Sequence, residues 1–263
     1  MVGYKKMIKG RMGIKMNETI QTLLAHQSIR KFKEQPLTEE MIQTLVQSAQ
    51  AASTSSYQQV YSIIGIEDPA IKKELATLAG NQTYVEKNGY FFVFCLDYHR
   101  HQLIATMAGT NIDDTVQSKE AFMVGTIDVS LAAQNLAIAA ESLGLGIVYI
   151  GGLRNNLEAV SSLLECPDHV VPLFGMAVGY PDATPGLKPR LPKEAVFHVN
   201  GYKKDEEALP VLEAFEQTTA TYYKERTGGE RQEGWAKQMA RVMETPNRLY
   251  MKEFIESKGL DKK

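Results

Sequence analysis

Cysteine is scarce in this chain of 263 residues, which contains only Cys95 and Cys166. Cys95 lies in an apolar Phe-Val-Phe-Cys-Leu run and Cys166 lies in Leu-Glu-Cys-Pro, so a strand and a helix end account for them better than a disulfide framework does. The scarcity argues against a small disulfide-stapled scaffold. It fits a reducing, cytoplasmic location.

Net charge and long apolar runs are also limited. The formal net charge is -2 at pH 7, which does not indicate a general surface for nucleic acid. The most apolar stretch, residues 131–150, is interrupted by Gln134, Asn135 and Glu141, whereas a transmembrane helix needs roughly 20 apolar residues. We therefore expect no nucleic-acid partner and no membrane span.

Motifs of several other chemistries are absent or out of place. The glycines at 144 and 146 close a helix, and a strand then leads to those at 151 and 152, whereas a Rossmann fingerprint needs a strand, then glycines, then a helix. His99 and His101 follow an apolar run, but no further ligands stand at a metal-binding spacing, so a solvated loop is expected there. Ser53 to Ser56 lack the surroundings of a nucleophile elbow. No metal and no catalytic nucleophile are predicted.

The chain does contain a regular succession of apolar helical and strand patterns. Thr38 and Asn155 are expected to cap the helices that follow them. The pattern at 122–143 is apolar almost all round and rich in alanine, which predicts packing against a sheet or a second subunit. Helices are predicted at 20–24, 38–52, 69–75, 122–143, 157–164, 206–224 and 233–258, and strands at 60–66, 90–96, 147–150 and 171–178.

One domain is expected, because the chain has no internal repeat, low-complexity segment or flexible linker. A helical pattern begins at Met16, so residues 1–15 are interpreted as a leader or upstream extension and the domain as residues 16–263. Residues 204–258 are expected to form a C-terminal helical excursion that packs across the body.

One polar constellation stands out. His26, Ser28 and Arg30 alternate along an extended stretch, which places three donors on one side, and Lys188 and Arg190 form a second alternating pair. Together they could clamp one phosphate. Spacing alone leaves open whether they do so or are ordinary surface residues.

Several motifs, in order along nearly the whole chain from about Met16, resemble the nitroreductase family. They occupy residues 26–32, 53–59, 80–82, 139–146, 149–156 and 187–192. The resemblance is closest to the oxygen-insensitive NADPH nitroreductases and the NADPH-dependent FMN reductases of the flavin reductase P type. It implies an α+β fold with a mixed, mainly antiparallel central sheet flanked by helices. It also implies a homodimer with a long buried helix at its two-fold interface.

The resemblance further implies one FMN in each of two pockets at that interface. His26, Ser28 and Arg30 are expected to bind the phosphate, ribitol and pyrimidine edge, with Lys188 and Arg190 closing on the phosphate. Arg30 is the candidate cation for the reduced ring. Contacts to the ring or ribityl chain, some from the opposite subunit, are expected from Ser53, Ser55, Gln82, Tyr149, Ile150, Gly151 and Gly152.

NADPH is the expected co-substrate. Arg226 and Arg231 match the arginines that meet its 2′-phosphate in relatives, although a basic glycine-rich loop can also serve only solubility. Arg154 and Arg248 are expected near the substrate pocket. Gln27 and the mixed 53–56 run depart from close relatives and bear on substrate preference.

The expected chemistry is ping-pong hydride transfer from NADPH through FMN to a nitroaromatic, a quinone or free flavin. The sequence does not choose among these acceptors. Two alternatives are a flavin-binding storage or sensor protein without turnover, and a dehydrogenase or dehalogenase on the same fold. The first would show damage at Arg226, Arg231 or the 151–152 glycines, and the second would carry a covering lid; neither feature is found.

Overall fold

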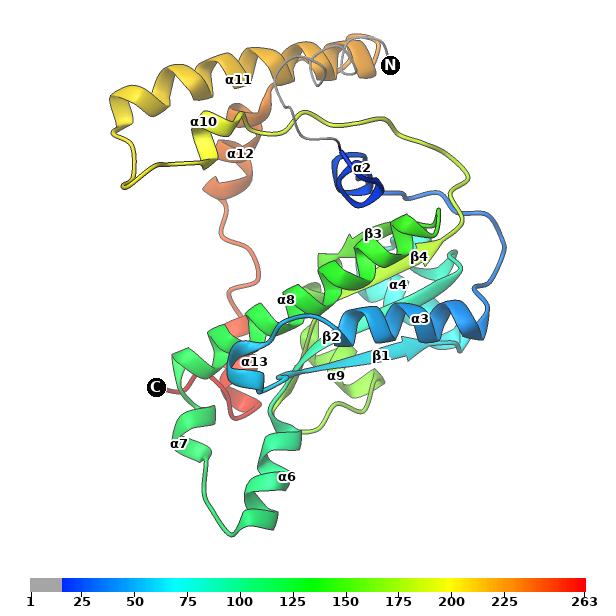
Figure 1. The fold of residues 1–263 in the computed structure, drawn as a ribbon, viewed down its shortest axis with the longest axis vertical. Coiled ribbons are helices and arrows are strands. Elements are labelled where there is room, and N and C mark those ends of the chain that lie inside the picture. Colours follow the sequence, from blue (N-terminus) through cyan, green and yellow to red (C-terminus); the bar gives the residue numbers. More distant parts are fainter. Residues whose placement is uncertain (1–15) are drawn as a thin grey trace. The chain divides into compact units, whose positions relative to one another are not determined.

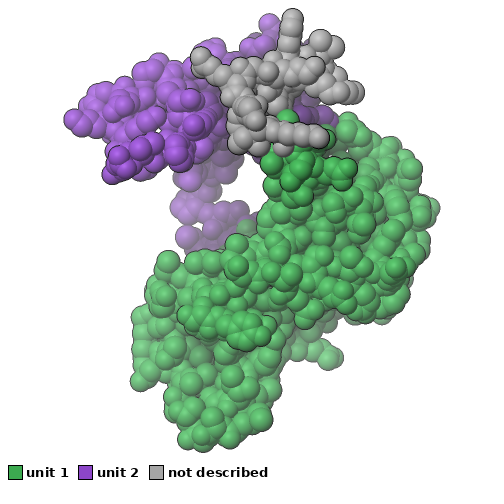
Figure 2. Space-filling model, in the orientation of Figure 1, with its two compact units in different colours: residues 1–185, 250–263 green, residues 186–249 purple. Residues whose placement is uncertain are grey.

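The computed structural model of the chain describes residues 16–263. The expected leader, residues 1–15, lies outside the described residues. Contacts divide the chain into two compact units, shown in separate colours in Figure 2. The first unit runs to Pro185 and takes up the chain again from Tyr250 to Lys263, and the second is Gly186–Leu249.

The centre of the first unit is a four-stranded sheet in the order β1-β2-β4-β3. Every neighbouring pair is antiparallel, with Ile63 opposite Phe94 and Val148 opposite Ala177. A single parallel bridge joins Ser28 to Ile147 at the β3 edge. The predicted mixed, mainly antiparallel sheet is therefore confirmed. The strands are β1 (Tyr61–Ile66), β2 (Tyr90–Asp97), β3 (Gly146–Ile150) and β4 (Val170–Gly179).

Helices cover both faces of this sheet, because its two central strands are apolar on both sides (Figure 1). On one face α3 (Glu39–Gln50) and α8 (Lys119–Ser142) close a core around Phe92 and Leu136. On the other face α4 (Pro69–Leu78), α5 (Thr83–Glu86) and α9 (Leu157–Leu163) close a second core around Phe91. The remaining elements of this unit are α2 (Glu18–Leu24), η1 (Ser55–Tyr57), α6 (His99–Ala108), α7 (Asp113–Val116), η2 (Gly151–Asn155) and α13 (Met251–Ser257).

Helix α8 is the longest of the first unit and is the only described helix whose length and composition would allow it to cross a membrane. Most of its core-facing residues are small, and Ala132 and Ala133 are completely buried together with the larger Leu136. It also buries the carboxylate of Asp128, which is hydrogen-bonded to backbone of a neighbouring loop. These properties are those of a central core helix, as the apolar pattern predicts.

Helix ends follow local chemistry in most places. Thr38 caps α3 through Met41 N at 3.3 Å, as expected. The cap expected at Asn155 is wrong by one residue, because Asn155 ends η2 and the side chain of Asn156 accepts from Ala159 N at 3.0 Å. The loop expected at His99 is also wrong, since α6 begins there.

The single helix expected at 233–258 is two helices, α12 (Trp235–Glu244) and α13. Thr245 ends α12 in an extended conformation with φ -108° and ψ 111°, as the residue before Pro246 prefers. Arg248 then takes a left-handed φ of 58°. The proline therefore accounts for the break.

The second unit contains α10 (Lys193–Val196), α11 (Asp205–Arg226) and α12. Trp235 packs edge-on against Phe215 with ring centroids 5.8 Å apart. The first turn of α12 is held by α11, because Thr219 Oγ1 accepts from Trp235 N at 2.8 Å and Glu216 Oε2 accepts from Ala236 N at 2.7 Å. This unit thus has an apolar contact and helix caps of its own.

Candidate functional site

The segment that carries His26, Ser28 and Arg30 is an extended strip along the β3 edge of the sheet. Ile29 N donates to Ile147 O at 2.8 Å, and the Ile29 side chain is buried. A Cβ on Gly146 would lie 2.5 Å from Ile29, so glycine is required at this position for the Ile29 side chain to pack against β3. His26 and Ser28 are half-buried and Arg30 is exposed, which leaves their polar groups accessible beside the sheet.

His26 has a partner that the sequence pattern does not reveal. Its Nδ1 lies 2.6 Å from Glu141 Oε1 near the end of α8, and the side chains are 28% and 13% exposed, respectively. Since an ionised carboxylate only accepts hydrogen bonds, Nδ1 carries the proton in this contact. The ring is held in one orientation with Nε2 left for a second partner. The only sequence signal for this contact is one of the few acidic residues in a largely apolar helix.

The end of β3 brings further predicted residues to the same edge. Tyr149 is partly exposed, packs edge-on against Phe174, and donates its hydroxyl to Gln134 Oε1 at 3.2 Å. Burial, followed by the charge of Glu141, raises the pKa of Tyr149 above its ordinary value of 10.0. Ile150 is buried. Tyr149 therefore acts as a neutral hydrogen-bonding group at neutral pH.

The two glycines after β3 are required by packing. A Cβ on Gly152 would lie 2.4 Å from Ala79 O and 3.0 Å from Gln82 Nε2, so the Gln82 side chain lies against this turn. A Cβ on Gly151 would lie 3.0 Å from the Arg154 guanidinium, which donates to Leu173 O at 2.7 Å. Arg154 thus supports the turn by binding the backbone of β4.

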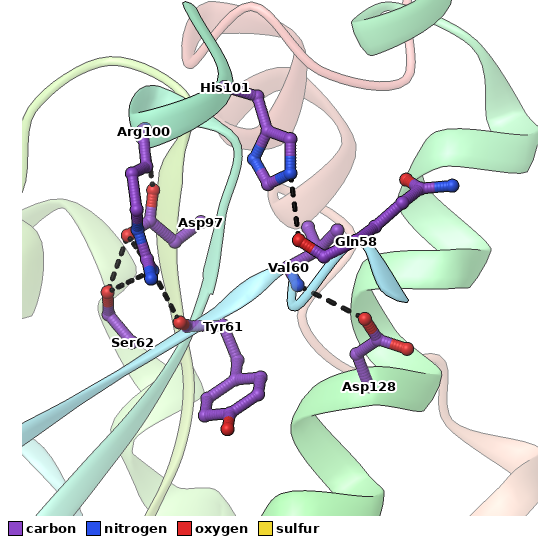
Figure 3. A network of polar contacts seen from close by, with 8 residues as sticks. All are labelled: Gln58, Val60, Tyr61, Ser62, Asp97, Arg100, His101 and Asp128. Atoms are coloured by element: carbon purple, nitrogen blue, oxygen red, sulfur yellow. Dashed lines mark hydrogen bonds and ion pairs between the residues drawn. The ribbon is translucent and has the colours of Figure 1, made fainter. Parts of the chain in front are cut away.

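The serine loop after α3 is held by a buried carboxylate. Asp128 Oδ1 accepts from Ser55 N at 2.9 Å and its Oδ2 accepts from Val60 N at 3.1 Å, the second of which is drawn in Figure 3. Asp128 is completely buried. Ser53 is exposed and Ser55 is half-buried at the start of this loop. Asp128 was not predicted, because its partners lie more than 60 residues away.

Three residues of the serine loop are in the left-handed region, Ser56, Tyr57 and Gln59, with φ of 48°, 62° and 57°. Each such non-glycine residue costs roughly 1 kcal/mol, so the surroundings must stabilise the loop. His101 Nε2 contacts Gln58 O at 2.9 Å and adds a second anchor (Figure 3). A loop kept in such a shape is typical of a functional site.

A second network of hydrogen bonds in Figure 3 attaches the start of α6 to β1. Arg100 donates to Tyr61 O at 2.7 Å and to Asp97 Oδ2 at 3.1 Å, and Ser62 donates to Asp97 Oδ2 at 2.5 Å. Burial raises the pKa of Asp97, but the hydrogen bonds from Ser62 and Arg100 and the charge of Arg100 outweigh it, so the pKa lies below its ordinary value. The carboxylate is therefore ionised at neutral pH.

The serine loop and the His26 strip are attached to α8 at separate places. Their anchors, Asp128 and Glu141, are 141 - 128 = 13 residues apart, which is about 20 Å along a helix and roughly 140° around it. Figure 1 shows α8 running along the sheet with β3 near its C-terminal end. The two predicted groups of ligands are thus anchored to different places on one helix, one near its middle and one near its C-terminal end.

In the second unit, Lys188 and Arg231 meet on one aromatic ring. The guanidinium carbon of Arg231 is 3.5 Å from the Tyr223 ring centroid and Lys188 Nζ is 5.4 Å from it. Arg231 also donates to Gln238 Oε1 at 2.5 Å, and Tyr223 is buried. A predicted FMN ligand and a predicted NADPH ligand therefore share a support that the sequence did not identify.

The other predicted cations of this unit, Arg190, Arg226 and Arg248, lie at separate positions in it. Arg226 packs 5.7 Å from the Tyr222 ring centroid and donates to the Tyr222 hydroxyl. Arg190 is exposed in the loop before α10. Arg248 is half-buried in the turn after Pro246. Arg226 and Arg231 are thus both held by tyrosines of α11, Arg226 through the Tyr222 hydroxyl and Arg231 over the Tyr223 ring.

Comparison with known proteins identifies the family to which this chain belongs. The model of the nitroreductase family matches residues 23–180, and the model of the nitroreductase family, C-terminal domain, matches residues 188–263. An FMN reductase (NADPH) from Bacillus subtilis is 54% identical over 248 residues, covering 94% of this chain and 100% of that protein. The chain belongs to the nitroreductase family.

Solved structures agree with this assignment. The structure of NfrA1 from B. megaterium has a TM-score of 0.92 at 55% identity and covers 93% of this chain and 100% of that one. The NADPH:FMN oxidoreductase from Vibrio harveyi, complexed with NAD+, has a TM-score of 0.85 at 42% identity and covers 94% and 100%. The predicted α+β nitroreductase-like fold is confirmed.

Proposed function

We propose that this protein is an FMN-dependent NADPH oxidoreductase that transfers two electrons to nitroaromatics, quinones or free flavin. The observation that carries the proposal is the strip of His26, Ser28 and Arg30 along β3, with His26 oriented by Glu141 at 2.6 Å. Support also comes from the FMN reductase (NADPH) of B. subtilis, which is similar over its whole length. When bound, FMN supplies hydride transfer at its N5 atom.

The donor set of the strip fits a phosphorylated flavin. An imidazole, a hydroxyl and a guanidinium follow one another on an accessible edge, and each can donate to phosphate or ribityl oxygens. Arg30 supplies the cation for the pyrimidine edge. On the resemblance to the family, Lys188 and Arg190 are proposed as further ligands of the phosphate.

The β3 end and the serine loop provide the ring contacts in this proposal. Tyr149 and Ile150 end the strand beside the strip, Gly151 and Gly152 follow it, and Gln82 approaches Gly152. Ser53 and Ser55 are attached elsewhere, through Asp128. In the proposed dimer, the serine loop of one copy reaches the His26 strip of the other. One site then takes its two groups of ligands from different copies, so their distance along a single α8 does not prevent them from meeting.

A homodimer is also supported by the outer side of α8. Met123, Ile127 and Leu131 follow one another at four-residue spacing, so they lie on one face, and they are 52%, 49% and 42% exposed. A stripe of large apolar side chains on a central helix is typical of an interface. A second copy is the occupant we propose. The dimer is expected to be soluble and cytoplasmic.

NADPH is the proposed reductant, with its 2′-phosphate bound by Arg226 and Arg231. The Arg231 guanidinium lies over the Tyr223 ring and that of Arg226 donates to the Tyr222 hydroxyl, which limits their freedom before a ligand arrives. Arg154 and Arg248 are proposed close to the acceptor, with Arg154 acting through the Gly151 turn. Protons are expected to come from water.

The decisive experiment mixes the purified, flavin-loaded protein with NADPH under anaerobic conditions and follows flavin absorbance by stopped flow. Bleaching, followed by reoxidation with nitrofurazone, a quinone or free FMN in separate mixes, is the expected result and ranks the acceptors. A protein that binds FMN but is not reduced would instead be a storage or sensor protein. Failure to bind FMN at all would overturn the proposal.

A further inference from the structure

A single hydroxyl group joins two elements at the turn that follows β3. Tyr250 Oη donates to Arg154 O at 2.8 Å and accepts from Leu157 N at 2.9 Å. Arg154 belongs to η2, the turn that begins with Gly151 and Gly152, and Leu157 is the first residue of α9. A tyrosine hydroxyl has one hydrogen to donate and lone pairs that accept, so both bonds form together. Tyr250 therefore bridges the junction between η2 and α9.

The backbone between these two elements is not helical. Asn156, which separates them, has φ -150° and ψ 83°. The N–H of Leu157 is one of the first in α9, and such groups have no acceptor within their own helix. The side chain of Asn156 caps a different group, Ala159 N, at 3.0 Å. Tyr250 thus supplies the acceptor that Leu157 N requires, and at the same time a donor for the last turn of η2.

Arg154 connects this junction to the glycine turn. Its guanidinium donates to Leu173 O on β4 at 2.7 Å, whereas its backbone carbonyl accepts from Tyr250. A Cβ on Gly151 would lie 3.0 Å from the same guanidinium. Because both the side chain and the backbone of Arg154 are bound, a shift of its backbone disturbs the group that lies against Gly151. The bond from Tyr250 therefore limits the movement of the turn.

Tyr250 is itself fixed by packing within the first unit. It is half-buried at the start of α13, where its backbone O accepts from Phe254 N at 3.1 Å. It packs against the apolar cluster that contains Leu157 and Ile255. Tyr250 is also the first residue of this unit after the chain returns from the second unit. Its hydroxyl is thus directed at the turn from a well-packed position.

We propose that Tyr250 is a positioning residue for the flavin, because its hydroxyl holds the turn of Gly151 and Gly152 where it contacts the ring. This inference rests on the proposed FMN site, in which that turn is a ring contact. Tyr250 does not touch the flavin and acts through Arg154 O and the backbone of η2. Since reaction rates fall steeply when the reacting groups are misplaced, Tyr250 affects the rate of flavin reduction more than the affinity for NADPH.

The test compares the flavin-loaded natural sequence with Tyr250→Phe, which keeps the ring and removes only the hydroxyl. Flavin reduction at saturating NADPH, followed by anaerobic stopped flow, is expected to slow roughly fivefold, the effect of about one lost hydrogen bond. The dissociation constant of NADPH is expected to stay within about twofold, because only the turn is displaced. Equal reduction rates in the two proteins would overturn the proposal, as would a slower rate that more NADPH restores.

Tyr98→Phe separates positioning from a general loss of stability. Tyr98 is buried, and its hydroxyl donates to the backbone of α8, at Ala121 O, over 3.0 Å. This control is expected to lower stability in urea by an amount similar to Tyr250→Phe and to be reduced at the natural rate. Equal slowing in both variants would make Tyr250 an ordinary structural residue. If the natural sequence neither bound FMN nor was reduced, the proposed function itself would fail, and this inference with it.

Discussion

His26 Nδ1 lies 2.6 Å from Glu141 Oε1, which joins the first residue of the proposed flavin strip to the end of the central helix α8. The partners are 115 residues apart in sequence. Because Glu141 is only 13% exposed, the contact is sheltered from solvent more than a surface ion pair is. It fixes an imidazole that would otherwise rotate.

Replacing Glu141 therefore tests the strip directly. Glu141→Ala is expected to weaken FMN binding by roughly tenfold or more, because it removes a hydrogen bond to a charged group worth about 1.5–3 kcal/mol. Glu141→Gln keeps an acceptor and should lose less. FMN dissociation constants from flavin fluorescence quenching measure the effect. Ser142→Ala, at the exposed neighbouring position, is the control, and equal loss in this variant would contradict a role for the His26 contact.

Asp128 is expected to maintain the shape of the serine loop. Asp128→Ala leaves Ser55 N and Val60 N without their acceptor, which should lower the free energy of unfolding by about 2 to 4 kcal/mol. Urea unfolding of the flavin-free protein measures this loss. Ser130→Ala, exposed on the same helix, should change stability little. An Asp128 variant of normal stability would show that the left-handed loop residues have another support.

The apolar stripe on α8 can be disrupted with one charge. Ile127→Glu, at a position that is 49% exposed, is expected to give a monomer by light scattering, because burying a carboxylate against a second copy is unfavourable. Thr77→Glu, exposed on α4 at the opposite face of the sheet, should remain dimeric. If the monomeric variant bound FMN as tightly as the natural sequence, the proposed contribution of the partner's serine loop would be wrong.

The lowered pKa of Asp97 predicts that part of the free energy of unfolding depends on pH in the acid range. Its folded pKa lies below the ordinary value of 3.8, because the hydrogen bonds from Ser62 and Arg100 outweigh burial. The unfolded state therefore binds the proton first, and the stabilisation is present above pH 3.8 and is lost as the pH falls through the lower folded pKa. Melting temperatures across this acid range should fall less steeply for Asp97→Asn, which is less stable at neutral pH. Parallel curves would contradict the assignment.

The sequence predicted the strands well because their signal is local. The apolar runs at 90–96 and 171–178 became the buried β2 and β4, and Thr38 capped α3 as expected. Helix α6 was missed because its first four residues are polar and its first turn depends on Asp97, whose Oδ1 accepts from Arg100 N at 3.3 Å. The break between α12 and α13 at residues 245–250 was also missed, although Pro246 is a sequence signal for the end of a helix.

Within the candidate site, the sequence identified surface groups and missed their supports. Motifs selected His26, Arg226 and Arg231, whereas Glu141 and Tyr223 were not selected. The supports are single residues in ordinary helical patterns, and their contacts depend on how distant segments pack. Gly152 illustrates the same limit: the motif identified it, but its close approach to Ala79 O appears only in the folded chain.

Arg226 and Arg231 are expected to set the preference of the protein for its reductant. Changing both to Ala should raise the Michaelis constant for NADPH, leave the constant for NADH nearly unchanged, and leave flavin content unaltered, because only NADPH carries the 2′-phosphate. Tyr223→Leu should act in the same direction through Arg231, whose guanidinium carbon is 3.5 Å from the ring centroid, by a few-fold for a cation–π contact of about 1 kcal/mol. Tyr223→Phe keeps the ring and is the control. Steady-state rates with both nucleotides decide the matter, since an unchanged ratio of the two constants would show that these arginines only solubilise the loop.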